Sequence, residues 1–578
     1  MKTGGTENIV GRTITIGIFF SLLLAVIGAK AAYLQIYRGD WLAKAAARQY
    51  KRSVVTPEKR GTIYDTKHRE MAVSIDMMSI AAFPQQIDDI HDASQKLTQR
   101  LKLNDGVLFK QMLSDRKFVW VKRHVTPREV ESVRGLSPEG ITFITEHSRF
   151  YPNKMLASQL LGFTGVDGDG LEGIEYYFDR YLRGETGKRT VIKDARGRGF
   201  GLATTGDPGA RGHDLILTID QTIQYIVEKE LAAAVGDVSA KSGMVVVMDP
   251  QTGAILALAN YPYFNPNAFG EYRRDVWRNR IITDPFEPGS TMKIFTAAAA
   301  LASGLVDSDT LFFTENGEYS IGENIIHDSH PHGWLTLDEI VKLSSNIGAA
   351  KISETIGSES LYRTLTDFGF RQKTGIDCPG ETAGALLPHH RWSKLDAAAI
   401  AFGQGISVSA IQLVRAVAAI ANGGTLMRPY VVQAVLDSNG GLVKRFGPEK
   451  IRQALSPELA ARIRSMMESV VDVGGTGVRA ALDGYSSGGK TGTAQKADKR
   501  GGYAENKYIA SFVGFAPAKR PEIAILVVID EPQEQYYGGT VAAPVFKQIA
   551  LKTLDYLNIP PRREKEQLTV SLGLGATG

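Results

Sequence analysis

The hydrophobic pattern of the chain begins with one long apolar run near the N-terminus. Thr13–Ala29 contains no charged residue and is rich in Ile, Leu and Phe, and Lys30 follows it. Because a lysine stem can stay in the bilayer while its amine reaches water, residues 13–36 are long enough to cross a membrane. A cleaved signal peptide with a site near Gly28-Ala29 is the alternative, but the run is long for one. We therefore predict a short N-terminal segment at 1–12 and a membrane anchor at 13–36.

Basic residues are unevenly placed around this run. Two of them, Lys2 and Arg12, precede it. Five follow it closely, and they are Arg38, Lys44, Arg48, Lys51 and Arg52. A count of Lys and Arg near the span places the following segment in the cytoplasm. Large domains cross membranes despite this bias, so the pattern by itself leaves the orientation open.

From residue 37 to about 235 the pattern mixes short apolar runs with charged, helix-like stretches. Trp41–Arg48 has the composition of a helix that leaves the membrane, and Arg60–Asp65 is typical of a strand followed by a turn. We find no cluster of reactive side chains in this region. The pattern predicts a non-catalytic α+β module at 37–235, acting as a spacer or binding platform.

The pattern changes again near residue 236. Helical periodicity, broken by Gly- and Pro-rich loops, fills the stretch from Ser290 to about Asp472. Apolar runs on either side of it predict four strands, which are Met244–Met248, Ala254–Ala259, Ile509–Phe515 and Ile523–Ile529. Strands at both ends with helices between them predict an α/β domain at 236–557, with one antiparallel sheet flanked by helices.

Composition narrows the class of protein. A chain of 578 residues is too long for one core, so we expect at least two domains. The net charge is +5, which gives little reason to expect nucleic acid as a partner. The single cysteine, Cys378, rules out an intramolecular disulfide and a Cys-rich metal site. Residues 558–578 are polar and then Gly-rich, and we expect a disordered tail there.

Candidate chemistry starts with a serine three residues before a lysine, a spacing that puts a nucleophile beside its base on a helix. The pattern occurs three times, at Ser114/Lys117, Ser290/Lys293 and Ser487/Lys490. Ser114 lies in a charged stretch typical of a surface, and Ser487 precedes two glycines that break helical spacing. Only Ser290 follows a Pro-Gly turn and opens an Ala-rich helical run, where the helix dipole favours a developing alkoxide.

Two further elements accompany Ser290. Ser344-Ser345-Asn346 offers a hydroxyl that can relay a proton and a carboxamide that can hold an amide, although alone it is an ordinary N-cap pattern. Lys490-Thr491-Gly492-Thr493 predicts an edge strand whose glycine lets another backbone approach closely. Its lysine and threonine side chains suit a carboxylate ligand.

Ser-x-x-Lys, Ser-x-Asn and Lys-Thr-Gly in this order form the signature of serine β-lactamases and penicillin-binding proteins. The chain resembles class B penicillin-binding proteins, and among them the division-specific peptidoglycan D,D-transpeptidases. The resemblance covers nearly the whole length and includes Arg60–Asp65, Gly170–Glu175, Arg278–Lys293, Gly403–Ile406, Gly474–Gly477 and Gly514–Pro517. It implies a transpeptidase domain of the penicillin-binding-protein and serine β-lactamase fold on an elongated, non-catalytic pedestal of the dimerisation type.

The resemblance also implies an acylation mechanism without a cofactor or metal. Ser290 would attack the penultimate D-alanine of a peptidoglycan stem peptide ending in D-Ala-D-Ala. Lys293 would take its proton and must be neutral to do so, which burial and the charge of Lys490 would favour. Ser344 would pass the proton to the leaving amine, and Asn346 would hold the substrate amide.

The third motif is implied to bind the substrate carboxylate. Lys490, Thr491 and Thr493 would contact it, with Gly492 between them in the strand. Backbone N–H groups of Ser290 and Thr493 would form an oxyanion hole, where each donor is worth roughly 3 kcal/mol. β-Lactams resemble the D-Ala-D-Ala end and would leave Ser290 acylated.

The family substrate lies outside the cytoplasmic membrane. The resemblance therefore implies that residues 1–12 are cytoplasmic and that the rest is extracytoplasmic, held at the inner membrane and the division septum. The implied partners are a polytopic peptidoglycan glycosyltransferase and other division proteins. An elongation-type transpeptidase, a membrane-bound β-lactam sensor and a D,D-carboxypeptidase are the alternatives.

Three other features carry chemistry less directly. His327, His330 and His332 have ligand chemistry, but Pro331 and Gly333 mark a loop, so we favour a structural role over zinc. Cys378 precedes a Pro-Gly turn and is interpreted as a bystander. The basic, Gly-rich stretch Lys496–Lys507 is interpreted as a solvated loop, with a mobile lip over the site as the alternative.

Overall fold

The computed structural model of the chain describes residues 6–56, 59–136, 140–184, 187–193, 199–203, 210–498 and 501–561. It contains two compact units that interleave along the sequence. Unit 1 is Met1–Glu58, Asp76–Ser148 and Glu185–Ala210, and unit 2 is Lys59–Ile75, Arg149–Gly184 and Arg211–Gly578. We expected one change of module near residue 236, whereas two earlier segments pack within unit 2. Most of the tail predicted at 558–578 lies outside the described residues.

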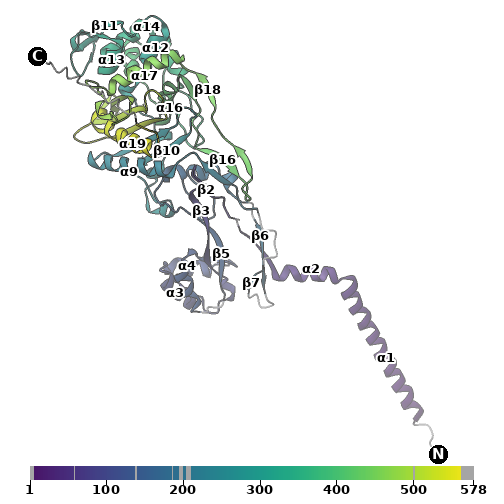
Figure 1. Cartoon of the computed structure of the whole chain (residues 1–578). Helices are drawn as coiled ribbons and strands as arrows, with labels where there is room; N and C mark the ends of the chain where they lie inside the picture. Colours follow the sequence, from purple (N-terminus) through teal and green to yellow (C-terminus); the bar gives the residue numbers. More distant parts are fainter. Residues whose placement is uncertain are drawn as a thin grey trace, which may run out of the picture. The chain divides into compact units, whose positions relative to one another are not determined.

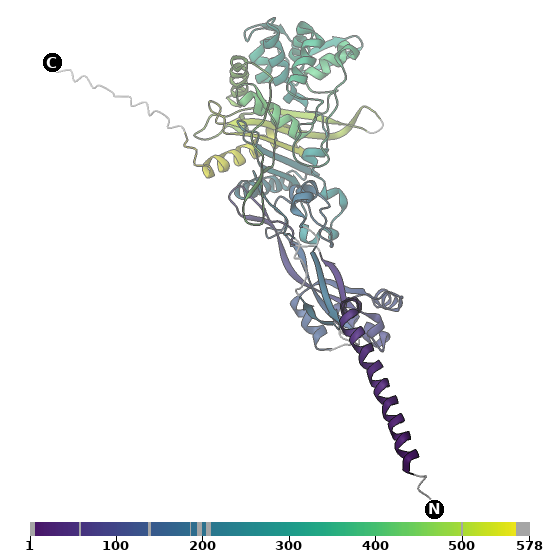
Figure 2. The same ribbon diagram turned by 90° about the vertical axis from the view of Figure 1, so that its right-hand side faces the viewer.

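Unit 1 begins with the apolar helix. α1 (Thr6–Ala32) passes through a π-helical turn, η1 (Tyr33–Tyr37), into α2 (Gly39–Tyr50). The chain bends between α1 and α2, as the two views show (Figures 1 and 2). The stretch Ile9–Tyr37 is long and apolar enough to cross a membrane, and the rest of the described chain leaves it uncovered. It includes residues 13–36, whose role as a membrane anchor stays a prediction.

The remainder of unit 1 is built from two antiparallel sheets. The first has the strand order β1-β6-β7, with bounds β1 (Lys51–Thr56), β6 (Gly187–Lys193) and β7 (Gly199–Ala203). The second joins the end of β3 (Glu70–Ala82) to β4 (Val119–Val125) and β5 (Ile141–Phe150). The helices beside this sheet are α3 (Ile90–Leu101), α4 (Asp105–Leu113) and α5 (Pro127–Arg134). Ile80, Leu97 and Val121 belong to the buried core they share.

Unit 2 is centred on a five-stranded antiparallel sheet of order β10-β9-β21-β20-β19. Its strands are β9 (Ser242–Met248), β10 (Ile255–Tyr261), β19 (Gly488–Ala497), β20 (Tyr503–Ala516) and β21 (Ile523–Asp530). All four predicted strands are present, and β19 is the predicted edge strand. Figure 2 shows the β19–β20 hairpin in yellow-green projecting from the sheet. The predicted antiparallel sheet flanked by helices is thereby confirmed.

Helices cover both faces of this sheet, which explains why its central strands are apolar without alternation. Val245 and Val247 face α9 (Gln221–Asp237) and α19 (Ala543–Tyr556) in one core cluster. Val246 and Met248 face the opposite cluster, which contains α16 (Ala410–Ala421) (Figure 1). Side chains of neighbouring residues therefore enter two different cores.

The segment between the strands is mainly helical, as predicted. Its longer helices are α12 (Lys293–Ser303), α13 (Leu337–Leu343), α14 (Asn346–Asp367), α15 (Lys394–Ala401) and α17 (Pro457–Val471). Short strand pairs interrupt it, and the helical pattern did not reveal them. They are β11 (Leu311–Phe313) with β14 (Trp334–Thr336), β12 (Glu318–Ile321) with β13 (Asn324–His327), and β15 (Thr425–Met427) with β18 (Lys450–Gln453).

Strand pairing outside the central sheet binds the early segments of the chain into unit 2. β2 (Ile63–Tyr64) pairs with β8 (Asp214–Leu217) and with the start of β3, and β8 continues to β16 (Val432–Leu436) and β17 (Leu442–Arg445). Short helices in unit 2 are α6 (Ser158–Leu161), α7 (Gly173–Tyr177), α8 (Asp179–Leu182), α10 (Arg274–Trp277), α11 (Arg280–Thr283) and α18 (Gly538–Val541).

Buried ion pairs hold these early segments. Glu175 is fully buried, and its two carboxylate oxygens lie 2.5 Å from Nε of Arg60 and 2.5 Å from Nε of Arg149. Burial raises the pKa of Glu175, but the two guanidinium groups outweigh this effect and lower the pKa below its usual value. The carboxylate therefore stays charged and joins two segments that are far apart in sequence.

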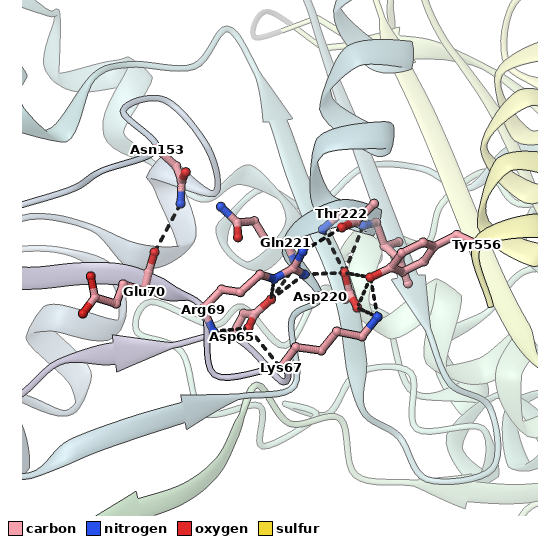
Figure 3. A network of polar contacts seen from close by, with 10 residues as sticks. Asp65, Lys67, Arg69, Glu70, Asn153, Asp220, Gln221, Thr222 and Tyr556 are labelled. Carbon is pink, nitrogen blue, oxygen red and sulfur yellow. Dashed lines mark hydrogen bonds and ion pairs between the residues drawn. The ribbon is translucent and has the colours of Figure 1, made fainter.

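A second polar network links the β2–β3 turn to two helices (Figure 3). Arg69 contacts both Asp65 and Asp220, and Asp220 also caps the N-terminus of α9. The hydroxyl of Tyr556, the last residue of α19, lies 2.9 Å from Asp220 Oδ2 and 2.5 Å from Lys67 Nζ. The turn, the start of α9 and the end of α19 are fixed to one another.

Candidate active site

Ser290 lies on a tight turn that the sequence around it imposes. A 3-10 turn, η4 (Gly289–Met292), precedes α12, so Ser290 sits one turn before the α-helix that we expected it to open. Gly289 has a φ of 54°, a conformation that favours glycine, and its N–H donates to Gly403 O at 3.1 Å. A Cβ on Gly403 would lie 2.0 Å from Gly289 O. Two glycines therefore let the loop at 403 support the turn that carries Ser290.

Lys293 is the first residue of α12 and is 1% exposed. Its Nζ lies 3.1 Å from Ser290 Oγ and 3.2 Å from Ser344 Oγ. It also lies 2.5 Å from Ser344 O and 2.8 Å from Asn346 Oδ1, two oxygens that can only accept. A neutral amine has two N–H groups, which these two oxygens use, and a lone pair that then faces the hydroxyls. The geometry suits a neutral amine acting as a base.

Electrostatics agree with this protonation state. Burial lowers the pKa of Lys293 to about 7, with the negative charge of Asp328 acting in the opposite direction. Lys490 is fully buried, and its pKa is lowered by burial and by the charge of Lys293. The two amines repel each other, so a positive charge on both at once is disfavoured.

Ser344 lies between these two amines. Its Oγ is 2.9 Å from Lys490 Nζ and 3.2 Å from Lys293 Nζ. Ser344 ends α13 with a φ of 64° and a ψ of 41°, a left-handed conformation that costs a non-glycine residue on the order of 1 kcal/mol. The break between α13 and α14 that results turns the Ser344 hydroxyl and carbonyl toward Lys293.

Asn346 begins α14, and both ends of its carboxamide are held. Its Oδ1 accepts from Lys293 Nζ at 2.8 Å, and its Nδ2 donates to His327 O at 2.8 Å. Asp328 fixes the backbone here, since its carboxylate accepts from Asn346 N and from the Ser345 hydroxyl, each at 2.5 Å. Ser345 is the N-cap of α14, as the N-cap interpretation of this motif predicted.

The edge strand β19 passes beside the turn that carries Ser290. A Cβ on Gly492 would lie 2.9 Å from Pro288 O and 2.3 Å from Ser511 Oγ, so this glycine allows the predicted close approach. Thr491 Oγ1 lies 3.1 Å from Thr476 Oγ1, and Thr493 Oγ1 accepts from Gly538 N at 3.1 Å. The structure thus brings together every residue that we predicted for the site.

The other candidates lie elsewhere or have other contacts. Ser114 belongs to unit 1, and its hydroxyl donates to Gln111 O. Ser487 is buried, and its hydroxyl donates to Ala480 O. Burial raises the pKa of the Cys378 thiol well above its usual value, which fits a bystander. The interpretation of Lys496–Lys507 as a solvated loop was wrong at both ends, because Lys496 and Ala497 end β19 and Tyr503–Lys507 begin β20, and Lys496 Nζ lies 2.7 Å from Asp530 Oδ1.

The histidine segment has a role that its side chains did not suggest. Among the described residues no group of His, Cys, Asp and Glu could hold a metal ion. The segment instead contacts Asn346 in two ways. The His327 carbonyl accepts from the Asn346 side chain, and the Asp328 carboxylate accepts from the Asn346 backbone N–H. Sequence reasoning missed Asp328 and assigned it no role in the site. Its place before the Ser-x-Asn motif was the available signal.

Two family descriptions match the chain. "Penicillin-binding Protein dimerisation domain" matches residues 55–217, and "Penicillin binding protein transpeptidase domain" matches residues 243–551, more than half of the chain. The chain belongs to the class B penicillin-binding proteins. The family named from the three motifs is confirmed, and its transpeptidase domain contains Ser290, Ser344 and Lys490.

Relatives of this penicillin-binding protein extend over its whole length. It is 36% identical to "Probable peptidoglycan D,D-transpeptidase PenA" of Neisseria meningitidis, over 97% of this chain and 95% of the relative. It is also 36% identical to "Peptidoglycan D,D-transpeptidase FtsI" of Escherichia coli, over 96% and 94%. The crystal structure of penicillin binding protein 3 from Mycobacterium tuberculosis with aztreonam superposes with a TM-score of 0.69 and 27% identity, over 88% and 98%.

Proposed function

We propose that this class B penicillin-binding protein is a peptidoglycan D,D-transpeptidase of cell division, with Ser290 as its nucleophile. The observation that carries the proposal is the contact set of Lys293, in which two obligate acceptors use the N–H groups of a neutral amine. Its lone pair is left for the Ser290 hydroxyl 3.1 Å away. A buried base with a pKa near 7 is matched to activating a serine at neutral pH.

In the acylation step, Ser290 Oγ attacks the carbonyl carbon of the penultimate D-alanine of a stem peptide. Its proton moves to Lys293, and the C–N bond to the terminal D-alanine breaks. The Ser344 hydroxyl, placed between Lys293 and Lys490, passes a proton to the departing amine. Backbone N–H groups of Ser290 and Thr493 stabilise the oxyanion, each by roughly 3 kcal/mol.

Substrate binding completes the charge arrangement. The terminal carboxylate binds Lys490, Thr491 and Thr493 along β19, with Gly492 allowing the strand to lie against the Ser290 turn. An anion beside Lys490 favours its ammonium form, and the repulsion between the two amines then keeps Lys293 neutral. Asn346 holds the substrate amide in an orientation fixed by His327 O and Lys293.

The acyl-enzyme is resolved by an amine from a neighbouring stem peptide, which forms the cross-link and frees Ser290. A β-lactam acylates Ser290 in the same way, and its opened ring stays attached. α1 spans the inner membrane, and the two domains face the cell wall. Its partners are a polytopic peptidoglycan glycosyltransferase and other proteins of the division septum, and the relative named FtsI supports this assignment.

Labelling with a fluorescent penicillin tests the nucleophile. Wild type and Ser487→Ala, a matched control for a buried serine of the same domain, should both label. Ser290→Ala should not, and a labelled Ser290→Ala protein would refute the assignment. Hydrolysis of the label within seconds would favour a carboxypeptidase or a β-lactamase instead, and a labelled protein that transfers no stem peptide to an amine acceptor would favour a sensor.

The cellular role needs its own measurement. Depletion of the protein should produce filamentous cells, because septal cross-linking stops while elongation continues. Rounded cells would identify an elongation enzyme and would contradict the division assignment without affecting the chemistry.

A further inference from the structure

The segment that follows the apolar helix has an aromatic and basic belt. The rings of Tyr33 and Tyr37 stack at 5.5 Å. Lys30 Nζ lies 5.5 Å from the centroid of the Tyr33 ring, and the Arg38 guanidinium carbon lies 5.9 Å from it. Arg38 also lies 5.4 Å from the ring of Trp41. Aromatic rings and long basic side chains of this kind occupy the headgroup level of a bilayer.

α2 continues this belt as an amphipathic helix. Asp40 and Lys44 lie four residues apart on one charged side of the helix, whereas Trp41, Leu42 and Ala43 lie elsewhere around it. The ring of Trp41 is 61% exposed and Leu42 is 40% exposed, so the described residues leave this surface open.

Charge in this stretch has one sign. From Arg38 to Arg52 the sequence contains five basic residues and a single acid, Asp40. When positive charge alone is counted, these residues predict that the segment after the span is cytoplasmic, which contradicts the extracytoplasmic orientation. The transpeptidase chemistry gives them no role.

We propose that α2, with Arg38 and Trp41 at its start, lies on the membrane surface and binds the headgroups of anionic phospholipids. Two observations support this inference. The segment continues directly from the apolar stretch Ile9–Tyr37, and its positive charge is complementary to anionic lipid. The bend between α1 and α2 lets α2 run along a surface that α1 crosses (Figure 1). The proposal rests on α1 crossing the membrane and holds on whichever side α2 emerges.

The size of the effect follows from the number of charges near the surface. One basic residue beside an anionic membrane strengthens binding by about fivefold, so the removal of two should weaken the docking of α2 by about thirtyfold. High salt should weaken docking as well, because these charges are exposed and are screened.

The test uses full-length protein in nanodiscs. A fluorophore is attached at Ala43→Cys, since Ala43 is exposed, whereas the native Cys378 is buried and stays unlabelled. Quenching by nitroxide headgroups is compared in phosphatidylcholine and in phosphatidylcholine mixed with phosphatidylglycerol. We expect quenching in the mixture, and much less of it in phosphatidylcholine or with Arg38→Gln/Lys44→Gln. Arg116→Gln/Lys117→Gln, an exposed pair in another part of unit 1, should behave like wild type.

Three results would overturn the proposal. Absence of quenching in both lipids would mean that α2 stays off the bilayer and faces solvent or a protein partner. Equal quenching in both lipids would mean apolar contact without headgroup recognition. Equal losses in both double variants would mean an unspecific charge effect. A separate label at Leu22→Cys, with nitroxides in the acyl chains, reports whether α1 spans, so failure of the span is distinguished from failure of α2 to dock.

Discussion

Neutral Lys293 is the central requirement of the proposed mechanism, and it makes the acylation rate depend on pH. With a pKa of about 7, Lys293 is mostly protonated at pH 6 and mostly neutral at pH 8. The neutral fraction rises from about 9% to about 91% between these values, so the acylation rate should rise about tenfold. An exposed lysine would still be protonated throughout this range.

The assay is the second-order rate constant for labelling by a fluorescent penicillin, measured from about pH 5 to about pH 9 with a check that the protein stays folded. We expect a rising limb with a midpoint near 7. A flat profile, or a rise that begins only above pH 9, would refute a neutral Lys293 as the base.

Asp328→Asn tests the cause of this midpoint. The negative charge of Asp328 raises the pKa of Lys293, so its removal should move the rising limb to lower pH. Asparagine keeps an oxygen that can accept from Asn346 N, and the start of α14 should therefore persist. A midpoint that moves up, or that stays while the rate falls, would mean that Asp328 acts only by holding α14.

Three further substitutions test the fold around the site. Gly492→Ala should lower the rate of penicillin labelling by about a hundredfold, because its Cβ would meet Pro288 O at 2.9 Å and push β19 away from the Ser290 turn; Gly236→Ala, with open space around its Cβ, should label normally. Tyr556→Phe should lower the free energy of unfolding by about 1–2 kcal/mol in denaturant titrations, because it removes a hydrogen bond to Asp220, and an unchanged midpoint would contradict this. Glu175→Gln should lower the free energy of unfolding by about 3–5 kcal/mol in the same assay, because it leaves two buried guanidinium groups without their carboxylate. A change near zero would show that the guanidinium groups find other partners.

Local signals in the sequence predicted much of this fold. The apolar run gave the helix Ile9–Tyr37, and the four apolar segments gave the central strands. α13 lies within the stretch predicted to be helical, and a capping box at Thr336 starts it. Strands β11–β14 were missed because pairs of three- and four-residue strands have no periodicity to detect.

The interleaving of the two units could not be predicted from local pattern. Arg60 and Glu175 lie 115 residues apart, and nothing in the composition of either segment indicates that they pair. Burial explains why the two residues pair, because a carboxylate that is fully buried requires cations at hydrogen-bonding distance. Lys496 illustrates the same limit on a shorter scale, since its partners are Asp530, the last residue of β21, and Glu531, which follows it.

The site itself shows where a motif stops being sufficient. Ser-x-x-Lys places Lys293 beside Ser290, but at the same spacing the half-buried Ser114 donates its hydroxyl to Gln111 O and Lys117 is exposed. Lys293 differs from Lys117 because two oxygens, from residues 51 and 53 positions downstream, accept its hydrogen bonds. These oxygens reach Lys293 only because Ser344 adopts a left-handed conformation between two helices. A base needs its N–H groups used and its lone pair free, and that condition is met by the break between α13 and α14. A glycine at position 344 would relieve the backbone strain but would lose the hydroxyl contacts, and a residue that keeps a hydroxyl would keep the strain. This is a physical reason for a serine to hold a conformation that favours glycine.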